Sequence, residues 1–273
     1  MELNEIKEHW DSISKRNRTA LSSTTKTATI KRLEVDAFVR AIRRVSDTTE
    51  SKTVLEVGCG NGFNIFGLAR EFPNFIFRGL DYIEDMISAA EENRQQYTDH
   101  QISFDVADVL EMGPSAPNQK KYDFVITNRL IINLNSWELQ QQALSNLLKL
   151  VKSEGHLIII ENFEGSYGNQ NLLRQLIELP ARVPDQYNKF LNENIFEEFL
   201  RSELSLDIVL SENFASLHDI MLYVLIPHID SGKVNYDHPL MESVTALLEK
   251  LPEEFKTNFG NFGQNRLYLL RRS

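Results

Sequence analysis

Hydrophobic positions recur along the chain with two different spacings, and the change from one spacing to the other predicts the fold. In residues 1–14 and 30–46 apolar side chains return every three or four positions, which predicts two amphipathic helices. The polar, serine- and threonine-rich residues 15–29 between them predict a loop, or a segment that orders when a ligand binds. Residues 1–50 are therefore interpreted as an N-terminal helical lid segment.

From Thr53 onward, short apolar runs alternate with helical patterns. Such alternation predicts parallel strands joined by helices. The expected fold is α/β: a Rossmann-like, seven-stranded, mostly parallel sheet with helices on both faces, plus a helical cap. The predicted strands cover residues 53–57, 75–81, 102–107, 122–127, 156–161, 206–214 and 266–271, and the predicted helices include 84–97, 136–151, 171–179 and 239–251.

The alternation divides the chain into further units. Residues 51–163 form the predicted nucleotide-type core. Residues 164–205 depart from it, with helical patterns around a proline-punctuated turn, and are interpreted as a helical cap insertion. Residues 206–273 are predicted to complete the core and to carry a helical insertion. The long connection between the last two strands can add to the cap or form a dimer face, so a homodimer is one expected assembly.

The net charge of −10 argues against a nucleic-acid partner, because proteins that grip phosphate backbones show a basic face. One stretch differs from this balance: residues 15–32 hold six basic side chains and no acidic one. A local basic patch on an acidic protein suits a small anionic ligand.

Other classes are disfavoured by simple counts. The single cysteine, Cys59, excludes an internal disulfide and a cysteine-based zinc site, and no spacing of acids and histidines predicts a metal site. The sequence shows no apolar run of transmembrane length and no signal-peptide pattern. The expectation is a cytoplasmic protein without a membrane partner.

The central motif is the run Thr53–Gly62, T-V-L-E-V-G-C-G-N-G. It predicts a buried strand, a glycine turn and the start of a helix, which together form the entry to a nucleotide-type pocket. Phe63 stands where a dinucleotide-binding loop would have its third glycine, and the carboxylate of Glu56 is a poor neighbour for a pyrophosphate. Both features disfavour an NAD-dependent dehydrogenase.

With Glu56 before the glycines, the loop resembles the first motif of the class I S-adenosylmethionine-dependent methyltransferases. The resemblance is specific over about residues 53–163. Farther along, the runs N-F-A-S, L-I-P-H and F-G-N-F-G-Q-N-R-L-Y-L-L resemble bacterial methyltransferases that act on small molecules, sugars or surface-polysaccharide precursors. The resemblance implies S-adenosyl-L-methionine as cofactor and S-adenosyl-L-homocysteine as product.

An acid about twenty residues past the glycines, at the end of the second strand, is placed to hold both ribose hydroxyls. Asp81 stands there. The resemblance implies adenine contacts from Asp108 and its neighbours. The cofactor-binding residues predicted in this way are Glu56, Gly58, Gly60, Asn61, Asp81, Tyr82, Ile83, Asp108, Val109 and Asn128.

Catalytic candidates are sought at the strand ends and in the insertions. Arg129 follows the fourth strand, and its guanidinium can hold a carboxylate, a phosphate or the cofactor's own carboxylate. His218 and then Glu161 are the predicted general bases; a surface or structural role is the alternative for the histidine. Thr27, Thr29 and Lys31 are lid or substrate candidates, with a solvated loop as the alternative.

The leading interpretation is an O-methyltransferase for a small anionic or sugar-linked metabolite in surface-polysaccharide precursor biosynthesis. The acceptor can be phosphorylated or nucleotide-linked. The alternatives are an N-methyltransferase for a sugar amine or amino acid, and a non-catalytic cofactor-binding partner protein.

Overall fold

The computed structural model describes residues 1–25, 27–112 and 120–272. The predicted loop over residues 113–121 lies mostly outside this part of the chain. The strands are β1 (Thr53–Val57), β2 (Ile76–Asp81), β3 (Gln101–Val106), β4 (Tyr122–Asn128), β5 (Val151–Asn162), β6 (Leu206–Glu212) and β7 (Asn265–Arg272).

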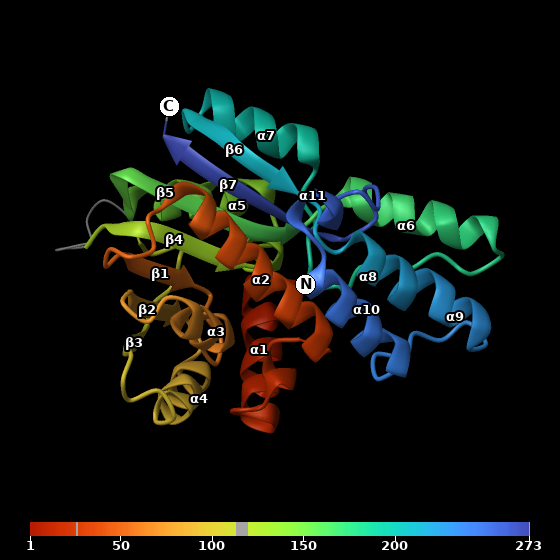
Figure 1. The fold of residues 1–273 in the computed structure, drawn as a ribbon, viewed down its shortest axis with the longest axis horizontal. Helices are drawn as coiled ribbons and strands as arrows, with labels where there is room; N and C mark the ends of the chain where they lie inside the picture. The colour runs from red at the N-terminus through yellow and green to blue at the C-terminus, as the bar shows by residue number, and fades with distance from the viewer. Residues whose placement is uncertain (26, 113–119, 273) are drawn as a thin grey trace.

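One seven-stranded sheet forms the centre of the molecule, with the strand order β3-β2-β1-β4-β5-β7-β6 (Figure 1). Strand β7 runs antiparallel to both of its neighbours, and the other pairs are parallel. This confirms the predicted fold class. The order reverses between β1 and β4, and that switch point is where open α/β sheets bind ligands.

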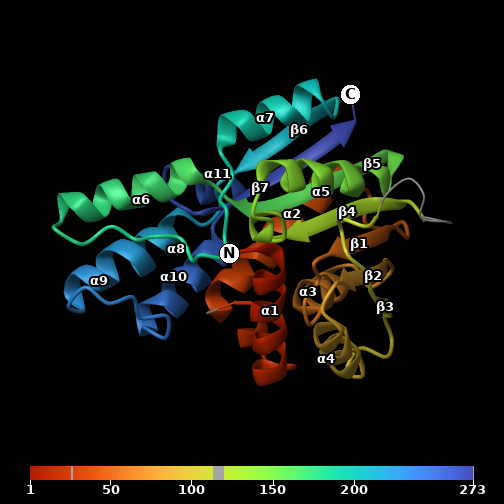
Figure 2. The same ribbon diagram turned by 180° about the vertical axis from the view of Figure 1, so that it is seen from behind.

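Helices cover both faces of the sheet (Figures 1 and 2). The α-helices are α1 (Leu3–Asn17), α2 (Ala28–Val45), α3 (Phe63–Glu71), α4 (Glu84–Arg94), α5 (Trp137–Lys149), α6 (Glu164–Leu176), α7 (Glu193–Ser202), α8 (Ser216–Ile220), α9 (Ile226–Ile229), α10 (Pro239–Lys250) and α11 (Glu253–Lys256). Short helical turns complete the list: η1 (Leu21–Ser23), η2 (Ile131–Asn133) and η3 (Met221–Leu225), the last of π type.

The two faces of the sheet bury two separate clusters of apolar side chains. Helices α2 and α3 contribute Phe38, Ile42 and Ile65 to the first cluster. Helices α5 and α7 contribute Leu144, Leu147 and Phe196 to the second. Burial of one such side chain contributes about 1.5–3 kcal/mol, so these clusters fix the strand ends that carry the site.

Packing moves two predicted unit boundaries. Helix α2, predicted as part of the lid, lies against the sheet and buries Phe38 completely. Helix α7, predicted as part of the cap, packs beside β6 and buries Phe196. Both helices therefore belong structurally to the layers of the core, because their apolar faces are covered by the sheet.

Some predicted element boundaries were wrong. Strand β5 begins at Val151 rather than at His156, because Val151 pairs with Tyr122 before the register shifts. Helix α6 begins at Glu164, seven residues earlier than predicted. Strand β3 ends at Val106, which leaves Asp108 in the loop beyond the sheet.

A helical lobe stands at the carboxyl ends of the parallel strands. Figures 1 and 2 show α6, α8, α9 and α10 gathered at one end of the molecule, with α1 beside them. In residues 1–25, 27–112 and 120–272, no helix is long and apolar enough to cross a membrane.

Candidate functional site

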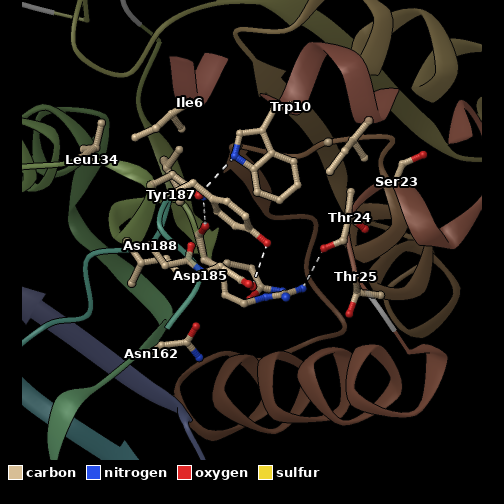
Figure 3. A pocket seen from close by; sticks show the side chains of 18 of the residues that line it. Ile6, Trp10, Ser23, Thr24, Thr25, Leu134, Asn162, Asp185, Tyr187 and Asn188 are labelled. Carbon is tan, nitrogen blue, oxygen red and sulfur yellow. Dashed lines mark hydrogen bonds between the residues drawn. The ribbon is translucent and has the colours of Figure 1, made fainter. Parts of the chain in front are cut away.

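A cavity of about 830 Å³ lies at the carboxyl ends of the parallel strands. Helix α1 and the segment after it form one wall, and the connection between α6 and α7 forms another (Figure 3). Tyr187 joins these walls. Its ring stacks on His9, with centroids 4.2 Å apart, and meets Trp10 edge-on. The aromatic contacts thus close the cavity between elements far apart in sequence.

The turn after β1 is shaped by glycines with positive φ angles, 75° at Gly58 and 52° at Gly60. A Cβ added to Gly60 would lie 2.5 Å from Cγ2 of Thr24. The N-terminal segment therefore lies directly on the glycine loop, and only glycine leaves room for both. Gly58 and Gly60 have no side chain of their own, and both residues line the cavity.

Asp81 ends β2 and lines the cavity. One carboxylate oxygen accepts a hydrogen bond from the Gly60 backbone N–H at 2.9 Å, and the other accepts from Ile83 N–H at 3.0 Å. Burial raises the pKa of Asp81 to about 6, while these N–H groups oppose the shift. Each oxygen keeps a lone pair that can accept a ligand hydroxyl.

Other predicted cofactor residues continue this wall. Tyr82, Ile83, Asp108 and Val109 all line the cavity. The Asp108 carboxylate accepts a hydrogen bond from the Leu110 backbone N–H at 2.9 Å, which fixes its side chain at the cavity edge. The structure thus brings together the residues predicted for an adenosine pocket.

Two predicted cofactor residues, Glu56 and Asn61, are not among the residues that line the cavity. Glu56 is fully buried and accepts a hydrogen bond from Asn64 at 2.6 Å, and burial raises its pKa to about 8. The Asn61 amide donates to the carbonyl of Ala20 at 2.8 Å. The structure therefore gives Asn61 a contact that holds the N-terminal segment on the glycine loop.

A buried charge network lies beneath the cavity, centred on Glu34 of α2. Glu34 is fully buried and forms ion pairs with Lys31 at 3.1 Å and with Arg129 at 3.2 Å. It also accepts hydrogen bonds from the amides of Asn128 at 2.7 Å and Asn265 at 3.0 Å. Burial alone would raise the pKa of Glu34, but the nearby cations and amide hold it below its usual range.

Arg129 lines the cavity in a left-handed backbone conformation, with φ 55°. A non-glycine residue there is uncommon and costs about 1–3 kcal/mol. Besides its ion pair with Glu34, the guanidinium donates to the Thr24 carbonyl at 3.2 Å. Arg129 thus ties β4 to α2 and to the N-terminal segment, and Glu34 partly neutralises its charge.

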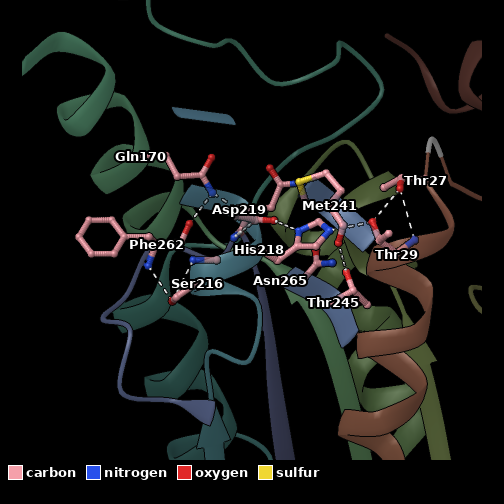
Figure 4. Close-up of polar contacts among 12 residues, drawn as sticks. Thr27, Thr29, Gln170, Ser216, His218, Asp219, Met241, Thr245, Phe262 and Asn265 are labelled. Carbon is pink, nitrogen blue, oxygen red and sulfur yellow. Dashed lines mark hydrogen bonds and ion pairs between the residues drawn. The ribbon is translucent and has the colours of Figure 1, made fainter. Parts of the chain in front are cut away.

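His218, the first predicted base, is not among the residues that line the cavity, and Figure 4 shows it between Asp219 and Thr29. Its ring is fully buried, with Nδ1 2.8 Å from the Asp219 carboxylate and Nε2 3.0 Å from the Thr29 hydroxyl. Thr29 also contacts Thr27, whose side chain reaches the cavity. With both nitrogens engaged, His218 couples α8 to the start of α2. This geometry disfavours direct contact with an acceptor.

Glu161, the second predicted base, is also absent from the cavity wall. It is fully buried, and its oxygens accept hydrogen bonds from the backbone N–H groups of Ile131 at 2.8 Å and Ile132 at 3.3 Å. Burial raises its pKa to about 8, against the effect of those N–H groups. The carboxyl group holds turn η2 onto the end of β5.

Sequence reasoning missed much of the opposite wall, where Arg182 lies among Tyr167, Tyr223 and Tyr236. The available signal was the short run from Pro180 to Tyr187, which combines a cation, two prolines and an aromatic ring at the predicted cap. The tyrosines come from three separate segments, so only the fold unites them. Within the described residues, no group of three or more His, Cys, Asp or Glu side chains could hold a metal ion.

A family model described as a methyltransferase domain matches residues 48–188. The chain belongs to the class I S-adenosylmethionine-dependent methyltransferases. It is 26% identical over 146 residues to a malonyl-[acyl-carrier protein] O-methyltransferase of Bacillus cereus, a match that covers 54% of this chain and 51% of that relative. It is 21% identical over 212 residues to an uncharacterised protein of Rickettsia prowazekii, covering 71% and 79%.

Solved structures show the same fold. A magnesium protoporphyrin IX methyltransferase from Synechocystis, crystallised with S-adenosylhomocysteine, has a TM-score of 0.56 at 17% identity, and the match covers 89% of this methyltransferase and 84% of that chain. A plantazolicin methyltransferase, also with the product bound, has a TM-score of 0.54 at 15% identity, covering 99% and 90%.

The residues of this methyltransferase fit its cofactor, S-adenosylmethionine. Gly58 and Gly60 line the cavity and have no side chain of their own, and Asp81 offers lone pairs for the ribose hydroxyls. The side-chain oxygen of Asn128 is buried on the cavity wall without a hydrogen-bond partner among the described residues, so it can accept from the ammonium group. The bound cofactor supplies an electrophilic methyl group attached to a sulfonium. Transfer of that methyl group leaves a neutral thioether.

Cofactor affinity is expected to fall as the pH drops below about 6. A carboxylate accepts hydroxyl protons, and the pKa of Asp81 is raised to about 6. Protonation weakens ribose binding, whereas folding itself is favoured there, because the native carboxyl retains a proton that the unfolded chain releases. Calorimetric titration with S-adenosylhomocysteine between about pH 5 and pH 8 measures this. Asp81→Asn is the control, and its affinity should not depend on pH. A wild-type affinity that stays the same between about pH 5 and pH 8 would contradict the prediction.

Proposed function

We propose that this methyltransferase transfers the methyl group to a carboxylate oxygen of a small anionic acceptor and forms a methyl ester. The observation that carries the proposal is the composition of the cavity wall. Among the described residues, Lys7, Lys31, Arg129 and Arg182 line it and no histidine does. An anionic oxygen needs no general base, whereas an alcohol usually does.

The carboxylates on the wall that could act as bases are already engaged. Asp219 contacts His218 through one oxygen and accepts from the Gln264 backbone N–H at 2.8 Å through the other. Asp185 accepts a hydrogen bond from the Tyr187 hydroxyl at 2.9 Å. Alignment of an acceptor that is already ionised therefore suits this cavity better than proton abstraction.

The relatives support the same chemistry. Curated relatives from Bacillus cereus, Ilyobacter polytropus and Halalkalibacterium halodurans are named malonyl-[acyl-carrier protein] O-methyltransferases. A malonyl thioester carries one free carboxylate, which is the oxygen nucleophile that the name implies. None of the relatives described above has a name that points to sugars, so the sugar-linked acceptor and the polysaccharide role remain predictions.

Catalysis in this proposal depends on positioning. The chain's residues hold the acceptor in line with the methyl group and exclude water, and alignment contributes up to about 7–11 kcal/mol in favourable cases. Helix α1 and the Tyr187 contacts cover the cavity and serve the exclusion of water. Arg129, kept from the sequence interpretation, is proposed to face the acceptor from the end of β4.

The test uses cofactor labelled in the methyl group with malonyl-pantetheine, and acetyl-pantetheine as the acceptor that lacks the carboxylate. A methyl ester releases volatile methanol in mild alkali, whereas an ether or an N-methyl group does not. Alkali-labile label that requires the carboxylate supports the proposal. Stable label on a hydroxyl or amine acceptor, and none on carboxylates, would overturn it.

An N-methyltransferase is the second candidate. The observation in its favour is the group of tyrosine rings on the cavity wall beside Asp185, because aromatic faces and a carboxylate together suit an ammonium group. A product assigned by NMR to an N-methyl group would decide for it.

A further inference from the structure

The guanidinium of Arg182 is held on a rigid aromatic support in the cavity wall. Its central carbon lies 3.5 Å from the ring centroid of Tyr223 and 4.9 Å from that of Tyr167. Nη1 donates to the side-chain oxygen of Gln170 at 2.6 Å, and both Nη atoms reach that of Gln264 at 3.4 Å. These contacts fix the plane of the guanidinium and leave its edge with Nε and the second Nη2 hydrogen without a partner among the described residues.

Arg182 forms no ion pair with a carboxylate among the described residues, although Asp185 and Asp219 act on the same tyrosine rings. Its side-chain hydrogen-bond partners are uncharged amides. Arg174, 3% exposed, lies nearby and donates to the carbonyls of Pro180 at 2.8 Å and of Tyr223. Burial, and then the charge of Arg182, lower the pKa of Arg174. Two neighbouring guanidinium groups without an ion-paired carboxylate favour the binding of an anion from solution.

A buried hydroxyl stands beside this cation. Tyr167 lines the cavity and is 6% exposed, and its oxygen has no hydrogen-bond partner among the described residues. Leaving such a group unpaired costs about 1–3 kcal/mol, which a bound ligand would recover. Burial raises the pKa of Tyr167, so the hydroxyl keeps its proton and can donate.

We propose that Arg182 and Tyr167 form the binding site for an anionic group of the acceptor, a carboxylate or a phosphate. The free guanidinium edge gives two parallel N–H donors that match the two oxygens of such a group, and the Tyr167 hydroxyl supplies a third. Amide contacts and ring stacking orient Arg182 before the ligand arrives. The inference rests on the proposed function and names the residues that select its substrate class.

The experiment measures binding of simple anions to the protein saturated with S-adenosylhomocysteine. Malonate and inorganic phosphate are the probes, and malonamide is the neutral counterpart of malonate. Calorimetry on the wild type should show millimolar or tighter binding of at least one anion and none of malonamide. Arg182→Gln should weaken anion binding about tenfold or more. Arg182→Lys should restore only part of it, because an ammonium lacks the fork.

Two further variants keep the test sharp if Arg182→Gln loosens the fold. Tyr167→Phe removes only the hydroxyl and should weaken anion binding about threefold or more. Arg201→Gln changes an exposed arginine of α7 that pairs with Glu197 and should leave binding unchanged. The preference between malonate and phosphate identifies the anion.

Anion affinity that is equal in the wild type, Arg182→Gln and Tyr167→Phe overturns the inference, as does binding of malonamide as tight as malonate, or no binding of either anion at millimolar concentrations. Failure of the proposed function is a separate result, since it is read from the absence of alkali-labile methyl transfer. Loss of product binding itself would point to the cofactor pocket instead.

Discussion

Replacement of Glu34 by alanine is expected to lower the free energy of unfolding by about 3–5 kcal/mol. Glu34 is fully buried, and the substitution leaves the Lys31 ammonium and the Arg129 guanidinium without their carboxylate. The amides of Asn128 and Asn265 lose an acceptor at the same time. Urea denaturation followed by circular dichroism measures the change, provided that the denaturant slope is the same in both proteins.

A matched exposed pair provides the control. Glu91 forms an ion pair with Arg94 on α4, with both side chains about two-fifths exposed, and Glu91→Ala should cost less than about 1 kcal/mol. The direction in which this stabilisation changes with pH is a second check. Because the pKa of Glu34 is lowered, its contribution is present above its unfolded pKa, about 4.3, and is lost below it. If Glu34→Ala and Glu91→Ala lowered the free energy of unfolding equally, the charge network around Glu34 would be screened by water like an exposed pair.

Replacement of Asp81 by alanine is expected to weaken binding of S-adenosylmethionine and S-adenosylhomocysteine about a hundredfold or more. A hydrogen bond to a charged group contributes about 1.5–3 kcal/mol, and the carboxylate is placed to accept from two ribose hydroxyls. The substitution also removes the acceptor for the Gly60 and Ile83 backbone N–H groups, which loosens the glycine loop. Calorimetric titration with both compounds measures the loss.

Asp105 provides the matched control for that substitution. It lies on the neighbouring strand β3, is exposed, and forms an ion pair with Arg78 at 2.8 Å away from the cavity. Asp105→Ala should keep cofactor affinity within about twofold of the wild type. NADH serves as a negative ligand for all three proteins. A wild-type affinity in Asp81→Ala would remove Asp81 from the ribose site.

The cavity also indicates where acceptor selection is to be sought. The glycine loop, Asp81 and Asp108 come from the N-terminal half of the sheet, whereas Arg182 and Tyr223 come from the connections that follow β5 and β6. Substitutions in the first group should change the affinity for the cofactor, whichever acceptor is used. Those in the second should change affinity for the acceptor alone.

The sequence by itself determined that Asp81 lies beside the glycine turn. Gly58, Gly60 and Asp81 belong to one βαβ unit, and the length of that unit places Asp81 beside the glycine turn whatever the rest of the chain does. The alternation of apolar runs likewise predicted the class of sheet, because strand and helix periods depend on local spacing.

Only the tertiary structure decided the rest. Sequence reasoning placed His218 and Glu161 at the reaction centre, yet packing turns both into buried contacts that do not line the cavity. Arg182 and Tyr223 lie in different insertions, and they meet because helix α6 and turn η3 pack together. Contacts between distant segments depend on which faces are buried together, and local residue patterns do not encode that choice.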